Sequence, residues 1–204
     1  MIRNIVFDMG MVLMQWDPMN PCMRYAKDPE KARILCDNIF RHPEWGATID
    51  GGLMTEAEYF IHCSKRMPTE ELRDLCLAMS KDWTLDSLYP TTGIKAMIQD
   101  LHRQGYKLYV LSNCGCHFHD FAYRIPGVEC FSGFLVSAEE HLIKPQPEIY
   151  ERLFEKFDLK PEECIFIDDL QANIDASIKA GMHGYCFADG DVKRLWDHLN
   201  SMND

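Results

Sequence analysis

Short apolar runs that end in polar residues restrict the fold of this chain more than any other feature. Residues 2–7 and 164–167 are apolar and rich in β-branched side chains, and each runs directly into an aspartate. Residues 107–111 form a third run, which ends at a serine and an asparagine. Runs of this kind are typical of strands buried on both faces of a sheet. Two further runs, at 134–136 and 184–187, also predict strands.

Amphipathic helical patterns separate these predicted strands. Apolar residues recur at helical spacing in residues 93–104, 147–157, 172–180 and 191–199. Strands that alternate with helices favour a parallel sheet with helices on both faces. We therefore predict an α/β protein with a Rossmann-like parallel sheet core.

Residues 15–90 depart from this alternation, because they are rich in helix-forming residues and contain no convincing strand pattern. Three amphipathic helices are predicted in this stretch, over residues 30–40, 55–67 and 70–81. Asp50-Gly51-Gly52 indicates a turn between two of them. We predict that residues 1–14 and 91–204 form the core, and that residues 15–90 form a helical cap that closes over the site.

The charge of the chain restricts the class of partner. The 204 residues carry a formal net charge of −11. A protein this acidic repels polyanions, so nucleic acids and anionic membranes are poor partners. No segment reaches the ~20 apolar residues that a membrane helix requires. A small anionic metabolite is still a possible substrate, because a bound divalent cation reverses the local charge of the site. We expect the protein to be a monomer or a homodimer.

The cysteines indicate a reduced compartment. There are nine, an odd number scattered along the chain, and Met1 to Phe7 do not have the pattern of a signal peptide. We predict a cytoplasmic protein with free thiols. The Cys114-Gly115-Cys116-His117 segment has only one residue between its cysteines, which is tighter than the usual zinc spacing.

Polar residues follow three of the predicted strands. Asp8 follows the first, Ser112-Asn113 the second and Asp168-Asp169 the third, and Lys144 precedes the third. Ligands of open α/β sheets bind at the carboxyl ends of the strands, so these groups are expected to converge on one crevice. A carboxylate nucleophile, two carboxylates for Mg²⁺ and an ammonium group for phosphoryl oxygens suit phosphoryl transfer.

Four segments together resemble a known family. They are Ile5-Val6-Phe7-Asp8-Met9-Gly10, Leu111-Ser112-Asn113, Lys144-Pro145-Gln146-Pro147-Glu148-Ile149-Tyr150 and Phe166-Ile167-Asp168-Asp169. Their order resembles the four motifs of the haloacid dehalogenase-like superfamily, and the insert resembles the helical cap of its subfamily I. The resemblance is strongest to the branch of bacterial α-glucose-1-phosphatases and of the amino-terminal phosphatase domain of epoxide hydrolases.

The resemblance implies a metal site. Asp8 would be the nucleophile and a Mg²⁺ ligand, and Asp169 the second carboxylate ligand. Gly10 would offer its backbone carbonyl to the metal. Asp168 would act on the metal through the residues that bind it or through water, and Asn173 would orient a metal-bound water.

The resemblance also implies a phosphate site. The Ser112 hydroxyl and the Asn113 backbone N–H would bind phosphoryl oxygens, and Lys144 would pair with both the phosphoryl group and Asp8. The implied activity is hydrolysis of a small phosphorylated metabolite through an aspartyl-phosphate intermediate.

Gly10 departs from the family pattern, in which a second aspartate at this position acts as general acid and base. A sugar 1-phosphate is a reasonable substrate hypothesis, because its leaving group is more acidic than an ordinary alcohol and needs less protonation. His117 is a candidate proton donor. His42, Trp45 and Asp17 are candidates to reach the substrate from the cap.

Three other functions compete with the phosphatase. A haloacid dehalogenase uses the same nucleophile without a metal, but the paired Asp168-Asp169 disfavours it. A phosphotransferase or sugar phosphomutase is disfavoured because it relies more heavily on the missing acid/base aspartate. A non-catalytic regulator that keeps the fold is the third alternative, and loss of the acid is its main support.

Overall fold

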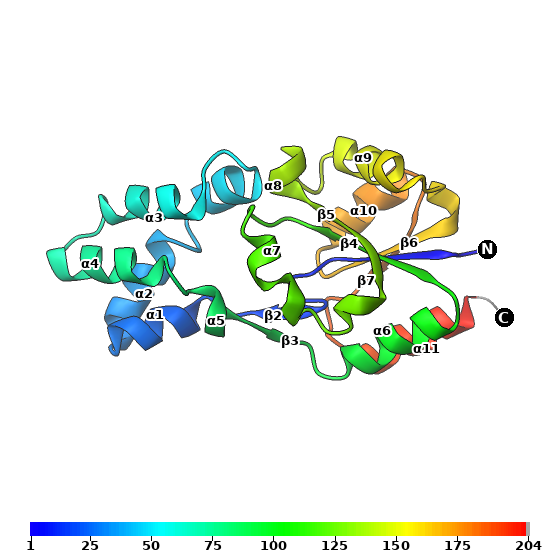
Figure 1. Cartoon of the computed structure of the whole chain (residues 1–204), viewed down its shortest axis with the longest axis horizontal. Helices are drawn as coiled ribbons and strands as arrows, with labels where there is room; N and C mark the ends of the chain where they lie inside the picture. The colour runs from blue at the N-terminus through cyan, green and yellow to red at the C-terminus, as the bar shows by residue number, and fades with distance from the viewer. Residues whose placement is uncertain (203–204) are drawn as a thin grey trace.

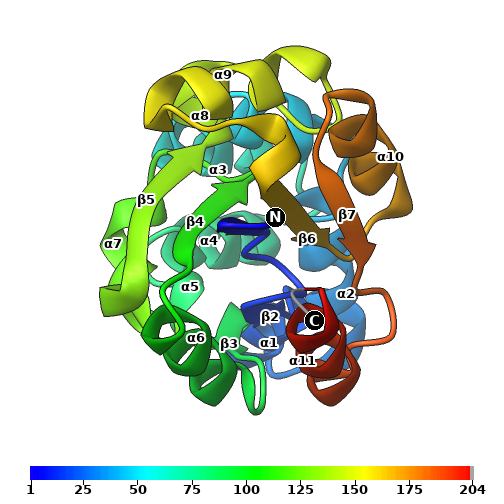
Figure 2. The same ribbon diagram turned by 90° about the vertical axis from the view of Figure 1, so that its right-hand side faces the viewer.

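A five-stranded sheet forms the centre of the larger part of the molecule (Figures 1 and 2). The computed structural model describes residues 1–202 of the chain. All neighbouring strands are parallel, and their order is β5-β4-β1-β6-β7. Their bounds are β1 Asn4–Phe7, β4 Lys107–Ser112, β5 Phe131–Val136, β6 Cys164–Asp168 and β7 His183–Cys186. The predicted α/β fold with a parallel sheet core is confirmed.

Helices cover both faces of this sheet (Figure 2). Because side chains alternate along a strand, Ile5 and Phe7 of β1 point to one face and Val6 points to the other. The first face packs against α6 Ile94–Arg103 and α11 Val192–Ser201, and the second against α9 Pro147–Phe157 and α10 Gln171–Lys179. Burial on both faces explains why these strands are almost entirely apolar in sequence.

Short helical turns complete this part of the chain. They are α7 Phe118–Phe121, η2 Ala122–Arg124, η3 Val128–Cys130, α8 Ser137–Glu140 and η4 Pro161–Glu163. α8 directly follows β5 and therefore lies at the same end of the sheet as Asp8, which follows β1.

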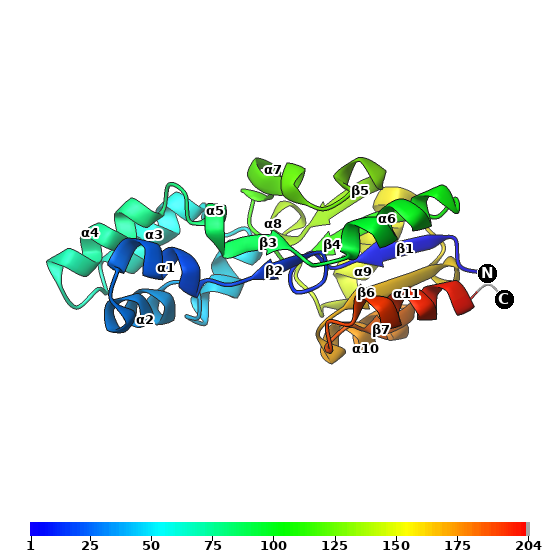
Figure 3. The same cartoon turned by 90° about the horizontal axis from the view of Figure 1, so that it is seen from below.

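Residues 19–87, here called the helical region, lie at the opposite end of the molecule from the two termini (Figures 1 and 3). They form α1 Met19–Ala26, α2 Pro29–Asn38, η1 Gly46–Asp50, α3 Glu56–Ser64, α4 Glu70–Met79 and α5 Thr84–Ser87. Their apolar faces bury a hydrophobic cluster of their own, which includes Leu35, Tyr59 and Trp83. The sequence did not predict α1, because Pro21 interrupts its pattern. Proline is tolerated there because it lies in the first helical turn.

Two short strands connect the helical region to the sheet. β2 Met14–Trp16 and β3 Leu88–Pro90 pair in antiparallel register, with Gln15 opposite Tyr89. The prediction of no strand between residues 15 and 90 is therefore wrong at its margins. Strands of three residues are too short to show an alternating pattern, and their pairing depends on two segments far apart in the chain.

Two further sequence expectations concern cysteines and membranes. All nine cysteines lie in the described part of the chain and are free thiols. No helix among residues 1–202 is long and apolar enough to cross a membrane.

Candidate functional site

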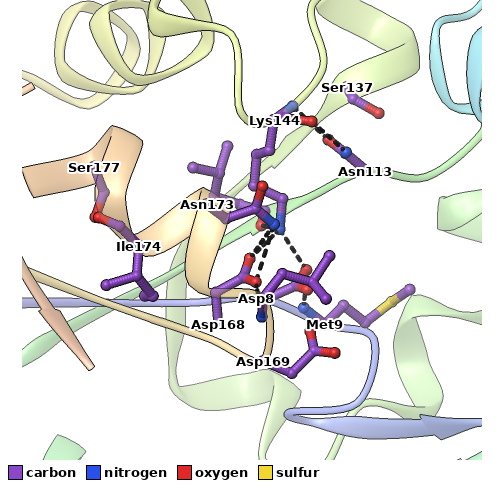
Figure 4. Close-up of polar contacts among 12 residues, drawn as sticks. Asp8, Met9, Asn113, Ser137, Lys144, Asp168, Asp169, Asn173, Ile174 and Ser177 are labelled. Carbon is purple, nitrogen blue, oxygen red and sulfur yellow. Dashed lines mark hydrogen bonds and ion pairs between the residues drawn. The ribbon is translucent and has the colours of Figure 1, made fainter. Parts of the chain in front are cut away.

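Asp8 lies immediately beyond the carboxyl end of β1, at the centre of the sheet. Its backbone N–H donates to the Ile167 carbonyl at 2.8 Å, which continues the pairing of β1 with β6. Its carboxylate atom Oδ1 accepts from the Met9 backbone N–H at 2.7 Å and lies 2.8 Å from Lys144 Nζ (Figure 4). A buried central strand thus fixes the position of this carboxylate.

Lys144 bridges two of the aspartates. Its Nζ lies 2.8 Å from Asp8 Oδ1 and 2.8 Å from Asp168 Oδ2, and it donates to the Leu111 carbonyl at 3.0 Å. The side chain of Lys144 is only 1% exposed. The side chain of Asn113 holds the backbone of Lys144, because Oδ1 accepts from the Lys144 N–H at 2.8 Å and Nδ2 donates to its carbonyl at 3.0 Å. Asn113 therefore positions the lysine, a role that the sequence did not reveal.

Asp168 is fully buried and its oxygens are already engaged. Besides Lys144, they accept from the Asn173 side-chain amide at 2.9 and 3.0 Å and from the Leu170 N–H at 2.8 Å (Figure 4). The Asp169 carboxylate accepts no side-chain hydrogen bond from the described residues, only one from its own backbone N–H, and it lines a cavity. The two neighbouring aspartates therefore differ, with Asp168 organising the site and Asp169 facing the space where a ligand would bind.

The site holds more negative than positive charge. The carboxylates of Asp8, Asp168 and Asp169 lie within 4.8 Å of one another and share one ammonium group, that of Lys144. Burial raises the pKa of Asp8 to about 7, since the opposing effect of Lys144 is partly cancelled by the two other aspartates. Burial alone would lower the pKa of Lys144, but the charges of Asp8 and Asp168 outweigh it, and that pKa is raised. Lys144 therefore stays charged.

The donor set fits Mg²⁺. Magnesium prefers oxygen ligands and usually takes one or two carboxylates from the protein. Asp8 and Asp169 offer carboxylate oxygens at the cavity, and Gly10, which also lines it, has a backbone carbonyl. Burial, followed by the charge of Asp168, raises the pKa of Asp169, because these two effects outweigh the opposing charge of Lys144. A divalent cation would offset the excess negative charge of this cluster.

A cavity of about 290 Å³ opens beside these carboxylates. It lies at the carboxyl ends of the strands, between the sheet and the helical region, where ligands of open α/β folds bind. Its sequence-predicted lining residues are Asp8, Gly10, Trp45, Asn113, His117, Lys144, Asp169 and Asn173. The structure thus brings together groups from five distant parts of the chain.

The remaining walls of the cavity are largely apolar. They are formed by Met9, Met11, Trp16, Trp83, Leu88 and Phe121, with Trp45 beside them. The indole rings of Trp16, Trp45 and Trp83 contact one another, with centroids 5.4 Å apart for Trp45 and Trp83 and 5.5 Å apart for Trp16 and Trp83. This aromatic wall joins the helical region to the site.

Besides the buried Asp168, three predicted residues do not line this cavity. Ser112 is only 1% exposed, although it ends β4 next to the site. The carboxylate of Asp17 forms a local hydrogen bond, which it accepts from the Met19 N–H at 3.0 Å. His42 lies near Glu44, with Nδ1 3.5 Å from the carboxylate. The role of Ser112 as a phosphate ligand remains a prediction.

His117 joins the two parts of the molecule. Its Nδ1 is hydrogen-bonded to the carboxylate of Glu56 at the start of α3, and its ring lies 4.9 Å from that of Trp83. Burial would raise the pKa of Glu56, but the hydrogen bond and charge of His117 outweigh it, and that pKa is lowered. Nδ1 of the candidate proton donor His117 is therefore already hydrogen-bonded to Glu56.

Asp50 is a lining residue that the sequence did not single out as functional. It is the last residue of η1, and two glycines follow it, so its local pattern indicates only a turn. The Ser137 hydroxyl of α8 donates to the Asp50 carbonyl at 2.6 Å and accepts from the Cys114 N–H at 2.9 Å. His141 Nδ1 lies 3.3 Å from the Gly51 carbonyl. The loop from Asp50 to Gly52, here called the docking loop, thereby rests on the core.

Comparison with known proteins decides the family. A model of the haloacid dehalogenase-like hydrolase family matches residues 61–181, more than half of the chain. The chain belongs to the haloacid dehalogenase-like hydrolase family. It is therefore a hydrolase, and Asp8 occupies the first of the segments in which the sequence resembles that family.

Relatives of this chain include a named phosphatase and a named flavin mononucleotide hydrolase. The chain is 27% identical to the sesquiterpene phosphatase astK of Aspergillus oryzae, over 92% of this chain and 90% of that protein. It is 25% identical to flavin mononucleotide hydrolase 1 of Arabidopsis thaliana, over 80% of this chain but only 63% of that protein.

Solved structures of the family share the fold. The enzyme bt-2542 of Bacteroides thetaiotaomicron, in complex with magnesium and inorganic phosphate, aligns with a TM-score of 0.63 at 25% identity, covering 91% of this chain and 94% of that one. L-2-haloacid dehalogenase of Xanthobacter autotrophicus aligns with a TM-score of 0.67 at 16% identity, covering 99% and 84%. The second likeness concerns the fold alone, since family members with different chemistry share it.

Proposed function

We propose that this hydrolase is a cytoplasmic, Mg²⁺-dependent phosphatase that transfers the phosphoryl group of a small metabolite to Asp8 and then to water. The observation that carries the proposal is the clustering of Asp8, Lys144 and Asp169 at one cavity, with Lys144 held between two carboxylates. The names of two relatives, a sesquiterpene phosphatase and a flavin mononucleotide hydrolase, support the same reaction class.

Each residue of the site would have a separate role in catalysis or metal binding. Asp8 Oδ2, which receives none of the hydrogen bonds of Oδ1, would attack phosphorus and form an acyl phosphate. Lys144 would stabilise charge on the phosphoryl oxygens. Asp8, Asp169 and the Gly10 carbonyl would hold Mg²⁺, which when bound supplies positive charge for the phosphoryl group. The buried Asp168 and Asn173 keep Lys144 in place.

Residues 15–90, which include the helical region, would act as a cap that encloses the site. Residues 1–14 and 91–204 would form the core that supplies the catalytic residues. The aromatic wall supports this role, because Trp45 and Trp83 line the cavity from the helical region. Closure would exclude water and strengthen the electrostatic interactions at the phosphoryl group.

The paired aspartates favour a phosphatase over a dehalogenase. A dehalogenase needs no metal, and a carboxylate facing the cavity at Asp169 would then be an unpaired charge near the nucleophile. A mutase or phosphotransferase would in addition have to exclude water in favour of a second substrate.

Removal of the metal is the first test. We expect EDTA to abolish hydrolysis of p-nitrophenyl phosphate and added Mg²⁺ to restore it. Mg²⁺ should also raise the melting temperature of the wild-type protein, because a ligand that binds only the folded state stabilises it. Asp169→Asn should lose this thermal shift. Full activity in EDTA would contradict the proposal and favour the dehalogenase.

The walls of the cavity bear on the substrate class. The part of the cavity away from Asp8, Lys144 and Asp169 is lined mostly by aromatic and aliphatic side chains. Asp50 and His117 are the lining residues there that carry a carboxyl or imidazole group. A sugar carries several hydroxyls that need partners when they are buried. The lining therefore supports an apolar or aromatic phosphate monoester, and a sugar phosphate, including a sugar 1-phosphate, is the second candidate.

A substrate panel separates these two classes. We expect kcat/KM for an isoprenyl or flavin monophosphate to exceed that for glucose 1-phosphate by roughly tenfold or more, the effect of burying a few extra apolar groups. Glucose 6-phosphate serves as the matched ordinary sugar ester. A preference for glucose 1-phosphate over all of these would overturn the assignment of an apolar leaving group.

The docking loop provides a further prediction. Gly52 has φ +71°, and a Cβ built on it would lie 2.2 Å from the Ala138 carbonyl oxygen of α8. Gly52→Ala should therefore push the loop off the core and lower kcat/KM by about 10²-fold, the effect of a displacement of about 1 Å at an active site.

Gly190→Ala is the matched control for this variant. Gly190 has φ +65°, but a Cβ there would meet nothing within 4 Å. Urea unfolding should show a loss of about 1 kcal/mol for Gly190→Ala from the positive φ and a larger loss for Gly52→Ala because of its added clash, and only Gly52→Ala should lose activity. Equal activities in the two variants would show that docking of this loop does not affect turnover.

A further inference from the structure

This chain has a glycine, Gly10, at the position where the resemblance to the family implies an acid/base aspartate. Gly10 lines the cavity two residues beyond the nucleophile, and a Cβ built on it would meet nothing within 4 Å. Cleavage of an ordinary phosphate ester benefits from a proton donor at the leaving oxygen. The following inference rests on the proposed phosphatase function.

Asp50 reaches the same cavity from the helical region. It lines the space together with Asp8, Gly10 and Lys144, and its side chain is partly buried. Its carboxyl group accepts no hydrogen bond and forms no ion pair within residues 1–202. Polar groups in a protein interior are normally paired, so a carboxyl left open toward a cavity is suited to a substrate atom.

The backbone around Asp50 is fixed from the core side. Its carbonyl accepts from Ser137 Oγ, and that hydroxyl is itself held by the Cys114 N–H. Gly52 packs against the Ala138 carbonyl so closely that only a glycine fits there. Asp50 is therefore placed by α8 of the core, and its position does not depend on the helical region alone.

The surroundings of Asp50 keep its carboxyl group titratable near neutrality. Burial raises the pKa of Asp50 to about 7, Lys144 opposes this, and the charges of Asp8 and Glu56 add to it. The other ionisable groups around Asp50 are the buried Cys114 thiol, His117, which is hydrogen-bonded to Glu56, Asp169 at the same cavity and His141 beside Gly51. An acid/base group works best when its pKa lies near the working pH.

We propose that Asp50 is a catalytic residue that donates a proton to the leaving oxygen of the substrate and later accepts one from the attacking water. In the first step, Asp8 Oδ forms a bond to phosphorus while the ester O–P bond breaks, and the leaving alkoxide takes the proton of the Asp50 carboxyl group. In the second step, the Asp50 carboxylate takes a proton from water as that water attacks the acyl phosphate. Inorganic phosphate leaves, and Asp8 and the protonated Asp50 are regenerated.

Leaving-group dependence distinguishes this role from a structural one. The p-nitrophenolate leaving group needs little protonation, whereas an alkoxide needs a proton. For Asp50→Asn we expect kcat/KM to fall by about 10²–10⁴-fold with an alkyl phosphate, the usual contribution of an acid/base group. With p-nitrophenyl phosphate the loss should be less than roughly tenfold. Asp50→Glu should recover part of the activity toward the alkyl phosphate.

The pH profile provides a second readout. Because the first step needs Asp50 protonated and Asp8 ionised, and burial raises the pKa of each to about 7, kcat/KM of the wild type with the alkyl phosphate should pass through a maximum and decline above about pH 7. Asp50→Asn should lose this decline. Unchanged melting temperature and circular dichroism would establish that the variant is folded.

The outcomes separate this inference from the proposed function. Equal losses with both substrates, or no loss with either, would overturn the catalytic role of Asp50 while leaving the phosphatase in place. A wild-type protein that hydrolyses no phosphate monoester in the presence of Mg²⁺ would overturn the proposed function and this inference together.

Discussion

Asp8→Asn is expected to lower turnover of any phosphate monoester by at least about 10⁴-fold, as removal of a covalent nucleophile does in other enzymes. The amide has no negative charge and is a far weaker nucleophile than the carboxylate. The fold should persist, because the amide oxygen can still accept from the Met9 N–H and from Lys144. Steady-state hydrolysis of p-nitrophenyl phosphate with saturating Mg²⁺ measures the effect.

Asp175→Asn is the matched control for the nucleophile. Asp175 is exposed on α10, and its carboxylate accepts only from the Gln171 side chain. The same change of carboxylate to amide should leave kcat/KM within twofold or so, as for most surface substitutions. Comparable activity of Asp8→Asn and the wild type would remove Asp8 from the mechanism.

Lys144→Met is expected to have the largest effect on stability. The lysine is 1% exposed and Asp168 is fully buried, so the substitution leaves buried carboxylates without their cation. Breaking a buried ion pair by removing one partner costs about 3–5 kcal/mol. The free energy of unfolding in urea, measured without Mg²⁺, should fall by this amount, and phosphatase activity should be lost as well.

Lys193→Ala is the control for the charge change. Lys193 pairs with Asp197 on the exposed face of α11, where the two side chains are 82% and 65% exposed. Such a pair contributes well under about 1 kcal/mol. If Lys144→Met and Lys193→Ala lowered the unfolding free energy equally, the ion pairs of Lys144 would have no special role in stability.

The sheet and the helices on its two faces were largely predictable from the sequence. β1, β4 and β6 are central and buried on both faces, so their sequences are short, apolar and β-branched. The amphipathic pattern of α9 also predicts its bounds, because Pro147 occupies a first-turn position and Asp158 ends the helix in the left-handed conformation. Local preferences and burial point to the same structure in these elements.

The convergence of Asp8, Lys144 and Asp169 could also be foreseen. Parallel strands bring their carboxyl ends to one edge of the sheet, so aspartates that follow β1 and β6 must lie close together. No comparable rule places Asn113, whose side chain binds the backbone of Lys144, 31 residues away. Side-chain partners of this kind depend on the folded loop and leave no signal in sequence spacing.

Asp50 was beyond prediction for a different reason. Its place at the cavity depends on the packing of the helical region against α8, a contact between segments 87 residues apart. In sequence, an aspartate before two glycines only indicates a turn. The pairing of β2 with β3 was hidden in the same way, because it joins residues that are far apart and belongs to strands of only three residues.

The central claim is that Asp8 carries the phosphoryl group during turnover. It is tested most directly by mixing the protein with Mg²⁺ and a radiolabelled phosphate monoester, quenching with acid within the first turnovers and mapping the label by peptide mass spectrometry. We predict acid-stable, hydroxylamine-sensitive label on the peptide that contains Asp8, and none in Asp8→Asn. Rapid hydrolysis of the ester with no label on Asp8 would contradict the account.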